Sequence, residues 1–471
     1  MRPQNKELAN QFIHSLGKVI RLPLLRPLFK LSLDAPNMTS FNVLIVGGGI
    51  SGPAAAYWLS RIPGAKVTLI ERSSQMRASG QQLDLRVAGV DMMKKMGIEP
   101  AVRAVRCQEP GTQVVDTDGR TKAYFPAADH GSGRQSMTSE YEIMRGDLVK
   151  ILYRLTHSRS NVRHVFNRTV ENFTQDDETD PNGKVYVTFS DGCQEKYDLV
   201  LAADGTGSKT RKIMLGPDAP DPRHRTGGYI GYFSIKSQPW DSDRSTYCQL
   251  PGPRMARAIM TRKDIPELTR IYMMLGRRDE SVDLALKSGN LTDLKKALAV
   301  VYEGGGWETK RFMAALVNAP EADDLYFTPF EEVRLPEGSW SKGRVVLIGD
   351  AAHSATANGY GTSWGLIGPY LLAGELATLY ENDKSLPTAS IIRAAKKYEK
   401  IWRPIALTGH GGSGFADSMF PPRSLIGIGI LNWFMGVAAY LKLDQYVGFD
   451  GSVGKWKLPD YPALSHDHGV D

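Results

Sequence analysis

Short apolar runs, separated by Gly-rich and polar segments, predict several buried strands. The first, FNVLIV at 41–46, is rich in β-branched residues and leads into a Gly-rich turn. Similar runs occur in KVTLIE at 66–71, at Leu199–Ala203 and in VVLIGDAAH at 345–353. After the first turn, PAAAYWLSRI has apolar residues at helical spacing, with Pro53 in the first helical turn. A strand, a helix and a second strand in this order predict an α/β unit.

The middle of the chain has a different pattern, in which apolar residues alternate as they do on strands with one buried face. The predicted strands are GYIGYFSIK at 228–236, ARAIMT at 256–261 and TRIYMML at 269–275, and helices follow at about 291–301 and 307–317. We expect a sheet with covering helices, which could roof a substrate pocket. Ordinary core packing is the alternative for each candidate lining residue: Tyr229, Tyr232, Phe233, Met255, Met260, Tyr272, Met273 and Met274.

The Gly-rich turn has the pattern G-x-G-x-x-G, with Gly47, Gly49 and Gly52 in GGGISG. Gly47 permits the tight turn, Gly49 lets the backbone approach a pyrophosphate, and Gly52 allows the helix to pack closely on the strand. Glu71 ends the second strand, 19 residues after Gly52, where it can accept hydrogen bonds from ribose hydroxyls. Strand, turn, helix, strand and acid therefore predict a dinucleotide site with a helix N-terminus at the phosphates.

Two further strands end in acidic residues. Asp204–Gly205 follows Leu199–Ala203, and Gly349–Asp350 follows the strand in VVLIGDAAH. Open α/β sheets bind ligands at the carboxyl ends of their strands, so both carboxylates are candidate ligand contacts. Each could instead be a turn residue or a helix cap.

Composition and charge exclude some classes of protein. The 471 residues exceed one ordinary domain, and 42% hydrophobic with 23% charged residues is typical of globular proteins. The net charge is +7, but residues 1–37 contain six basic and two acidic residues, which leaves +3 for the rest. A nucleic-acid surface is therefore not indicated.

The three widely spaced cysteines form no metal motif and no disulfide framework, and we expect packing roles for them: Cys107, Cys193 and Cys248.

Both ends of the chain have segments that raise the question of a membrane. Residues 8–33 are apolar and basic without an acidic residue; they could be a transit peptide, a membrane-surface segment or, as we favour, an extension upstream of a start at Met38. Residues 424–441 carry no charge, but their glycines and Asn432 favour a buried or surface-docked helix over a membrane span.

The three motifs GGGISG, LVLAADGTGSKTR and VVLIGDAAH resemble, in order and spacing, those of the group A flavin-dependent (FAD) monooxygenases, the single-component aromatic hydroxylases. The resemblance runs from about residue 41 to about 400. The segments RASGQQLDLR at 77–86, EYEIMRGDL at 140–148 and TSWGLIGPYLLAGEL at 362–376 are most similar to the branch of tetracycline-inactivating and fungal biosynthetic monooxygenases. The implied fold is α/β: an FAD/NAD(P)-binding Rossmann-like domain with an inserted β-sheet (α+β) substrate domain.

The resemblance implies roles for residues that match the motifs. Glu71 would bind the adenosine ribose of FAD, Asp84 would sit beside the flavin, and Arg145 would bind FAD from a helix start. Arg77 would lie where this branch contacts NADPH. Asp350 would hydrogen-bond the ribityl or pyrophosphate part of FAD.

Two loops complete the implied cofactor site. Asp204 and Gly205 would lie near the FAD pyrophosphate and serve NAD(P)H binding, and the Gly359–Gly361 region would place N–H groups near the flavin ring. The full set is Gly47, Gly49, Gly52, Glu71, Arg77, Asp84, Arg145, Asp204, Gly205, Gly349, Asp350, Gly359 and Gly361. This sequence departs from the family at SATA-N, where Ala357 stands near an expected proline. We interpret His353 as structural or loop-ordering rather than catalytic.

The implied enzyme uses NAD(P)H and O₂ to hydroxylate or epoxidise a small aromatic or polyketide-like molecule through a flavin C4a-hydroperoxide, with no side chain assigned as an acid or base. The alternatives are another flavin oxidoreductase, a reductase or oxidase, and a non-catalytic flavin-binding protein.

No metal and no nucleic acid is expected, and the location is cytoplasmic or peripheral to an intracellular membrane, with a mitochondrial address as the alternative. The expected parts are a basic extension (1–37), an FAD-binding domain (38–110, 140–220 and 329–405), a substrate domain (111–139 and 221–328) and a C-terminal helical segment (406–471).

Overall fold

The computed structural model divides the chain into two units, Met1–Met38 and Thr39–Asp471. All described residues belong to the second unit, so the basic extension and residues 8–33 lie outside the description, as do Arg77 and Ala357. The described residues are 40–76, 80–86, 88–127, 140–252, 255–355, 359–408, 410, 422–443 and 456–465.

A mostly parallel sheet carries the first Gly-rich turn at the end of its central strand. In the described residues its order is β17-β18-β11-β1-β2-β7, and only β17 runs antiparallel to its neighbour. The central strand β1 is buried on both faces from Val43 to Val46, which explains why its sequence is continuously apolar there. The strands are β1 (Phe41–Val46), β2 (Ala65–Ile70), β7 (Val162–Val165), β11 (Leu199–Ala202), β17 (Ser341–Lys342) and β18 (Val345–Leu347).

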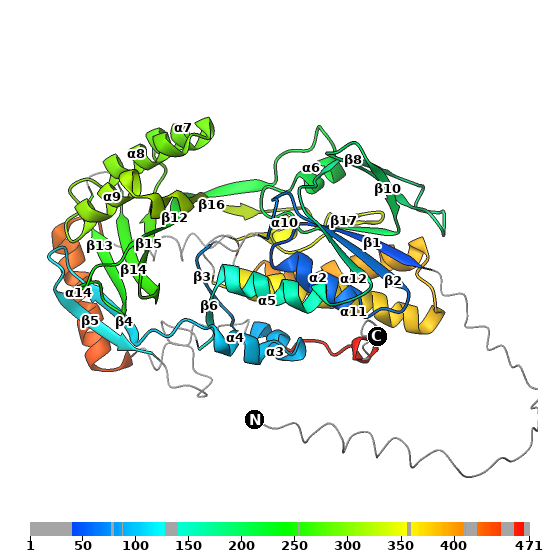
Figure 1. The fold of residues 1–471 in the computed structure, drawn as a ribbon, viewed down its shortest axis with the longest axis horizontal. Coiled ribbons are helices and arrows are strands. Elements are labelled where there is room, and N and C mark those ends of the chain that lie inside the picture. Colours follow the sequence, from blue (N-terminus) through cyan, green and yellow to red (C-terminus); the bar gives the residue numbers. More distant parts are fainter. Residues whose placement is uncertain are drawn as a thin grey trace, which may run out of the picture. The chain divides into compact units, whose positions relative to one another are not determined.

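Helices cover one side of this sheet and a small antiparallel sheet covers the other (Figure 1). The long helix α11 is buried over most of its length, because it packs against α2, α3 and α12. The helices are α2 (Ser51–Leu59), α3 (Ala88–Lys95), α4 (Glu99–Ala104), α5 (Arg145–His157), α11 (Gly361–Asp383) and α12 (Thr388–Ala406). On the other side lie β8 (Val170–Gln175), β9 (Val185–Phe189), β10 (Gln194–Tyr197) and α6 (Lys209–Leu215).

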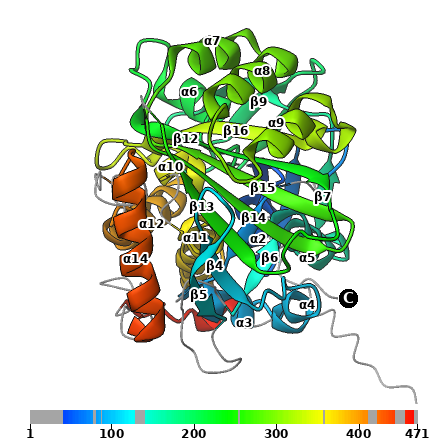
Figure 2. The same ribbon diagram turned by 90° about the vertical axis from the view of Figure 1, so that its left-hand side faces the viewer.

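The alternating middle of the chain forms a second sheet, in the order β16-β12-β15-β14-β13-β4-β5 among the described residues. Its strands are β4 (Gly111–Val115), β5 (Thr121–Pro126), β12 (Arg223–Lys236), β13 (Ser245–Leu250), β14 (Arg257–Ile265), β15 (Leu268–Leu275) and β16 (Tyr326–Val333). Parallel pairing of β4 with β13 joins two distant segments, and β16 crosses the boundary expected at 328. One face packs on α7 (Glu280–Ser288), α8 (Leu291–Tyr302), α9 (Thr309–Asn318) and η1 (Pro320–Asp324) (Figure 2).

A two-stranded ribbon lies next to both parts. It pairs β3 (Gln82–Asp84) with β6 (Glu142–Met144), and the N–H of Gln82 donates to the Tyr272 hydroxyl of the second sheet at 3.0 Å. The remaining elements are α10 (Asp350–His353), α14 (Leu425–Tyr440) and η4 (Pro462–Leu464). The predicted α/β fold with an additional sheet is thus confirmed.

The uncharged segment at 424–441 forms α14, which packs beside β5 and β4. None of the helices in the described ranges has the length and apolar character that crossing a membrane requires.

Candidate active site

Three loops meet at one edge of the parallel sheet. β1 pairs with β11 and β11 pairs with β18, so the carboxyl ends of these strands are neighbours. The Gly-rich turn follows β1, the Asp204 loop follows β11 and the Asp350 loop follows β18. The N–H of Ala203 donates to the carbonyl oxygen of Val46 at 2.8 Å, which holds the first two loops together. Motifs that are far apart in the sequence therefore converge on one site.

Close packing explains two glycines of the turn. Gly47 has φ 116°, and a Cβ there would lie 2.4 Å from the carbonyl oxygen of Ala203. A Cβ on Gly52 would lie 1.9 Å from the carbonyl oxygen of Gly47. The first turn of α2 thus packs directly on the loop that leaves β1.

Gly49 borders open space instead. A Cβ there would meet one atom within 4 Å among the described residues, the Nη2 of Arg145 at 3.6 Å. The N-terminus of α2, with Ile50 as its N-cap, has no side-chain cap and no acidic residue in its first turn. Space beside uncapped N–H groups at the positive end of a helix suits a pyrophosphate, so these residues fit a dinucleotide such as FAD.

Glu71 holds the turn through backbone hydrogen bonds. Its Oε2 accepts from the N–H of Gly48 at 2.8 Å, and its Oε1 accepts from the N–H of Ser73 at 3.0 Å. A carboxylate oxygen can accept more than one hydrogen bond, so the expected ribose contact is compatible with this geometry. Sequence reasoning did not anticipate the contact of Glu71 with the turn.

Arg145 lies between the turn and a second Gly-containing loop. It begins α5, and its N–H donates to the carbonyl oxygen of Gln81 at 2.9 Å. Its Cδ would lie 2.9 Å from a Cβ on Gly80, while its Nη2 is near Gly49. The backbone places this guanidinium beside the open face of the turn.

Asp350 reaches the same region from β18. The preceding Gly349 lies against the start of α2, since a Cβ on it would be 2.2 Å from the Oγ of Ser51. The Asp350 side chain is accessible to solvent, yet surrounding protein atoms raise the pKa of its carboxyl by desolvation, and the charge of Arg145 opposes this. A carboxyl that solvent can reach although protein atoms surround it on most sides is typical of the wall of a recess.

The Asp204 carboxylate is occupied by the start of α6. Its Oδ1 accepts from the Ser208 hydroxyl at 2.5 Å, and its Oδ2 accepts from the N–H and hydroxyl of Thr210 at 3.0 and 2.9 Å. The helix-cap alternative therefore describes this side chain in the structure. Gly205 is different: it has φ 84°, and no atom among the described residues comes within 4 Å of a Cβ built on it.

Asp84 lies on the ribbon, where it is half-buried and forms an ion pair with Arg86 at 2.7 Å. The N–H of Arg86 donates to the Oγ of Ser363 in α11 at 3.0 Å, so the ribbon approaches the start of that helix. Gly359 and Gly361 lie just before and at this helix start, with no described atom within 4 Å of a Cβ on either. The N-terminus of α11 has no side-chain cap.

Sequence reasoning missed a buried charge cluster behind Asp84. The Nε of Arg262 donates to the two carboxylate oxygens of Glu109 at 2.9 and 3.0 Å, and Nη2 donates to Glu142. Burial raises the pKa of Glu142 to about 8, although the charge of Arg262 acts against this. The one available signal was a charged residue, Arg262, directly after the alternating run at 256–261.

The predicted pocket-lining residues divide between the two faces of the second sheet. Half of them pack into the core beneath α7–α9: Tyr229, Phe233, Met255 and Met273. On β15, Tyr272 and Met274 alternate with Met273 and so belong to the opposite face, where the ring of Tyr232 packs edge-on against that of Tyr272 at 4.7 Å. Met260 is paired with Tyr272 and shares this face. The hydrogen bond from Gln82 to Tyr272 shows that this face lies toward the ribbon of β3 and β6.

His353 is enclosed by aromatic side chains. Its Nε2 accepts from the indole N–H of Trp402 at 3.1 Å, and its ring packs against those of Trp340 and Trp364. Burial lowers the pKa of the imidazole to about 3 and keeps it neutral. These contacts support the structural interpretation.

Comparisons with known proteins agree with this arrangement. Residues 40–246 match a family described as the FAD binding domain. Flavin-dependent monooxygenase eupH of a Phoma species is 42% identical over 91% of this chain and 99% of the relative. FAD-dependent monooxygenase asL4 of Sarocladium schorii is 35% identical over the same shares. The crystal structure of tetracycline destructase Tet(55) superposes with a TM-score of 0.69 and 27% identity, covering 90% of this chain and 99% of that one.

These relatives match almost the whole chain rather than the nucleotide-binding motifs alone. They also confirm the branch that the sequence motifs indicated, because both fungal monooxygenases and a tetracycline destructase are among them. FAD is the cofactor of this family, and NAD(P)H is its usual co-substrate. The chain therefore belongs to the flavin-dependent monooxygenases and is an FAD-dependent oxidoreductase.

Proposed function

We propose that this monooxygenase hydroxylates or epoxidises a small aromatic or polyketide-like molecule with NAD(P)H and O₂. The observation that carries the proposal is the convergence of the open Gly49 turn, Arg145 and Asp350 at one edge of the parallel sheet. The likeness to a tetracycline destructase supports a polyketide-like substrate. The names of the fungal relatives agree with a monooxygenase reaction.

The cofactor contacts belong to the same proposal. The N-terminus of α2 and the backbone at Gly49 bind the pyrophosphate of FAD, with Arg145 and Asp350 at its side. Glu71 binds the adenosine ribose with the acceptor capacity that its two backbone contacts leave. Asp84 and the backbone at Gly359 and Gly361 adjoin the flavin ring. Asp204, Gly205 and Arg77 serve NAD(P)H, with Arg77 assigned from the sequence alone.

The chain's own task is to position the substrate and to exclude water. The redox chemistry, hydride uptake from NAD(P)H and activation of O₂, is supplied by FAD when it is bound. The second sheet is the substrate-binding part, and its face with Tyr232, Met260, Tyr272 and Met274 borders the substrate. An apolar face of this kind excludes water and offers hydroxyl groups that orient an aromatic ring.

Asp350→Ala is expected to lower FAD affinity at least about tenfold, because it removes the carboxyl group that hydrogen-bonds the ribityl or pyrophosphate part of FAD in the proposed site. The measurement is a fluorescence titration of the stripped protein with FAD. Asp118→Ala is the matched control, since Asp118 is an exposed residue of the β4–β5 turn. Equal affinities for the two variants would remove Asp350 from the cofactor site.

The reaction class is tested with the reconstituted protein, NADPH and a set of phenolic and polyketide compounds. We expect O₂-dependent NADPH consumption coupled to a product about 16 Da heavier than the substrate, the mass of one oxygen atom. A dehydrogenated product would indicate an oxidase or reductase. Protein that stays colourless after FAD addition would contradict flavin chemistry altogether.

A further inference from the structure

Helix α14 exposes apolar residues and buries a polar one. Large side chains along its outer face are strongly exposed, including Ile426 at 78%, Trp433 at 63% and Phe434 at 58%. Asn432 is buried, and its Oδ1 has no hydrogen-bond partner among the described residues. The full set of exposed large apolar residues here is Leu425, Ile426, Ile430, Trp433, Phe434, Tyr440, Leu441 and Leu443. An ordinary surface helix has the opposite arrangement.

The inner face is held firmly against the second sheet, so the outward orientation is fixed. Met435 and Ala439 pack on the small core of β4 and β5, and the backbone at Gly436 approaches β5 so closely that a Cβ would lie 2.8 Å from the carbonyl oxygen of Lys122. The N–H of Gly252 donates to the carbonyl oxygen of Arg423 at 3.2 Å, just before the helix. Figure 2 shows α14 (orange) along this edge of the sheet.

The chemistry of this face fits a lipid surface. Residues 422–443 contain no acidic residue, and their two charges, Arg423 and Lys442, flank the helix at its two ends. Trp433 and Tyr440 combine an apolar ring with a polar group, as residues at a membrane interface do. A helix of 16 residues is about 24 Å long, less than a hydrocarbon core, so α14 can lie in the interface without crossing it.

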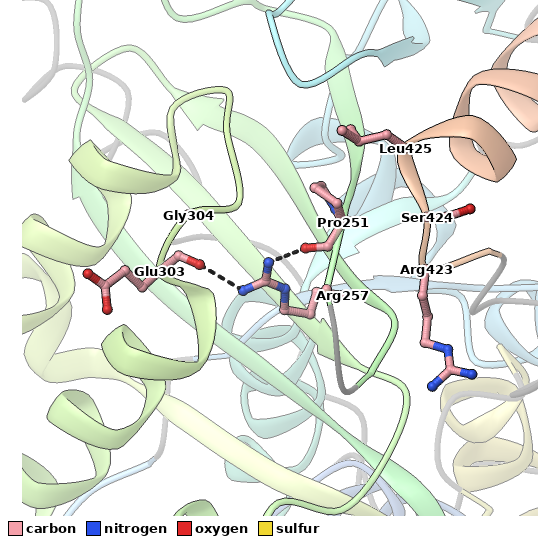
Figure 3. A pocket seen from close by; sticks show the side chains of 8 residues that line it. Pro251, Arg257, Glu303, Gly304, Arg423, Ser424 and Leu425 are labelled. Atoms are coloured by element: carbon pink, nitrogen blue, oxygen red, sulfur yellow. Dashed lines mark hydrogen bonds between the residues drawn. The ribbon is translucent and has the colours of Figure 1, made fainter.

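A basic pocket lies at the N-terminal end of the same face (Figure 3). It has a volume of about 540 Å³, and its lining includes two arginines, Arg257 and Arg423, and one acidic residue, Glu303, beside Ser424 and Leu425 at the start of the helix. The buried guanidinium of Arg257 donates to the carbonyl oxygens of Pro251 and Glu303, while its Nε has no partner among the described residues. Positive charge beside an apolar face suits the phosphate of an anionic lipid.

We propose that the outer face of α14 docks on an anionic membrane surface. The helix lies in the plane of the interface with its apolar side chains among the acyl chains, and Arg423 and Lys442 lie at the headgroups. A second copy of the chain is less suited to this face, because a two-fold interface would bring the basic ends of two such helices together, and residues 422–443 contain no acidic residue to offset them. The proposal does not depend on the identity of the substrate.

The test is flotation of the full FAD-loaded chain with vesicles of phosphatidylcholine alone and with vesicles that also contain phosphatidylserine. The double variant Ile430→Ser with Trp433→Ser should bind the anionic vesicles about 100-fold more weakly, about tenfold for each apolar anchor lost. The matched control is Val300→Ser with Trp240→Ser, which removes a β-branched aliphatic residue and a tryptophan, 69% and 66% exposed, from other surfaces. Unchanged flavin content and circular dichroism establish that each variant is folded.

The contrary outcomes are distinct. Flotation of the α14 variant equal to that of the control would overturn the proposal. This holds even if residues 8–33 also bind lipid, because separate lipid contacts multiply the partition constant and the loss of one contact still lowers it. If the wild type is a dimer that does not bind vesicles, and the α14 variant is a monomer, the face would be assigned to a second copy of the chain. Arg423→Gln with Lys442→Gln should weaken binding to anionic vesicles about tenfold. Equal binding of the wild type to both vesicle types would overturn the assignment of an anionic surface.

Discussion

Gly52→Ala is expected to destabilise the folded chain by about 3 kcal/mol or more, whereas Gly49→Ala, three residues earlier, is expected to leave the fold intact and to weaken FAD binding. A Cβ on Gly52 would overlap the carbonyl oxygen of Gly47 at 1.9 Å, and backbone atoms at a strand end cannot move aside. A Cβ on Gly49 would meet a single protein atom at 3.6 Å, the flexible guanidinium of Arg145. The same added methyl group therefore separates a packing role from a binding role.

Unfolding of the stripped protein and titration with FAD measure the two effects separately. Gly49→Ala should unfold like the wild type but bind FAD about 100-fold more weakly, because its methyl group occupies the space left for the pyrophosphate. Gly52→Ala should yield little folded protein and a lower unfolding midpoint. Wild-type FAD affinity in folded Gly49→Ala would show that no phosphate lies against this turn. Unchanged stability in Gly52→Ala would contradict the tight contact between α2 and β1.

The nucleotide-binding part was predictable because steric rules act locally along the chain. A strand that is buried on both faces is continuously apolar, as β1 is from Val43 to Val46, and a turn that packs a helix against that strand leaves no room for a Cβ at Gly52. The order of strand, turn, helix and strand then follows from the sequence alone. The acids Asp204 and Asp350 were correctly placed at strand ends for the same reason.

The direction of side chains in the second sheet was not predictable. Alternation along TRIYMML indicates that Tyr272 and Met273 point to opposite faces, but it does not say which face the helices cover. That choice depends on pairing with β12 and on packing of α7–α9, and both are long-range contacts. The helix-cap alternative for Asp204 could be weighed from the sequence, in contrast, because its partners Ser208 and Thr210 lie within six residues of it.

Burial of charge was the largest omission. Glu109, Glu142 and Arg262 come from three distant segments, and each is unremarkable in its own stretch of sequence. Their pairing exists only because the ribbon with β6 lies against β14. The side chains of Glu109 and Glu142 are 2% and 4% exposed, so a single guanidinium serves two buried carboxyl groups, and burial favours a proton on Glu142.

Arg262→Met is expected to lower the free energy of unfolding by about 3–5 kcal/mol near pH 8, because it leaves buried carboxylates without their counter-charge. The cost should be smaller at pH 6, where Glu142 of the wild type holds its proton, than at pH 9, where the carboxyl has lost its proton and needs the guanidinium. Urea titration at the two pH values measures the difference. Arg120→Met is the matched control: Arg120 pairs with Asp118 in an exposed turn, and its loss should change stability little at either pH.

The free energy of unfolding of the wild type should also depend on pH through the Glu142 carboxyl. Burial raises the pKa of Glu142 from its ordinary value of 4.5 to about 8, so the folded chain holds a proton that the unfolded chain has released across this window. Stability from this group is therefore complete below about pH 4.5 and is lost as the pH rises through about 8. Glu142→Gln, which keeps a neutral acceptor for Gln82, should flatten the decline between pH 5 and 8. A decline as steep as that of the wild type would assign the proton to another group. An equal cost of Arg262→Met at pH 6 and pH 9 would show that Glu142 does not titrate beside the guanidinium.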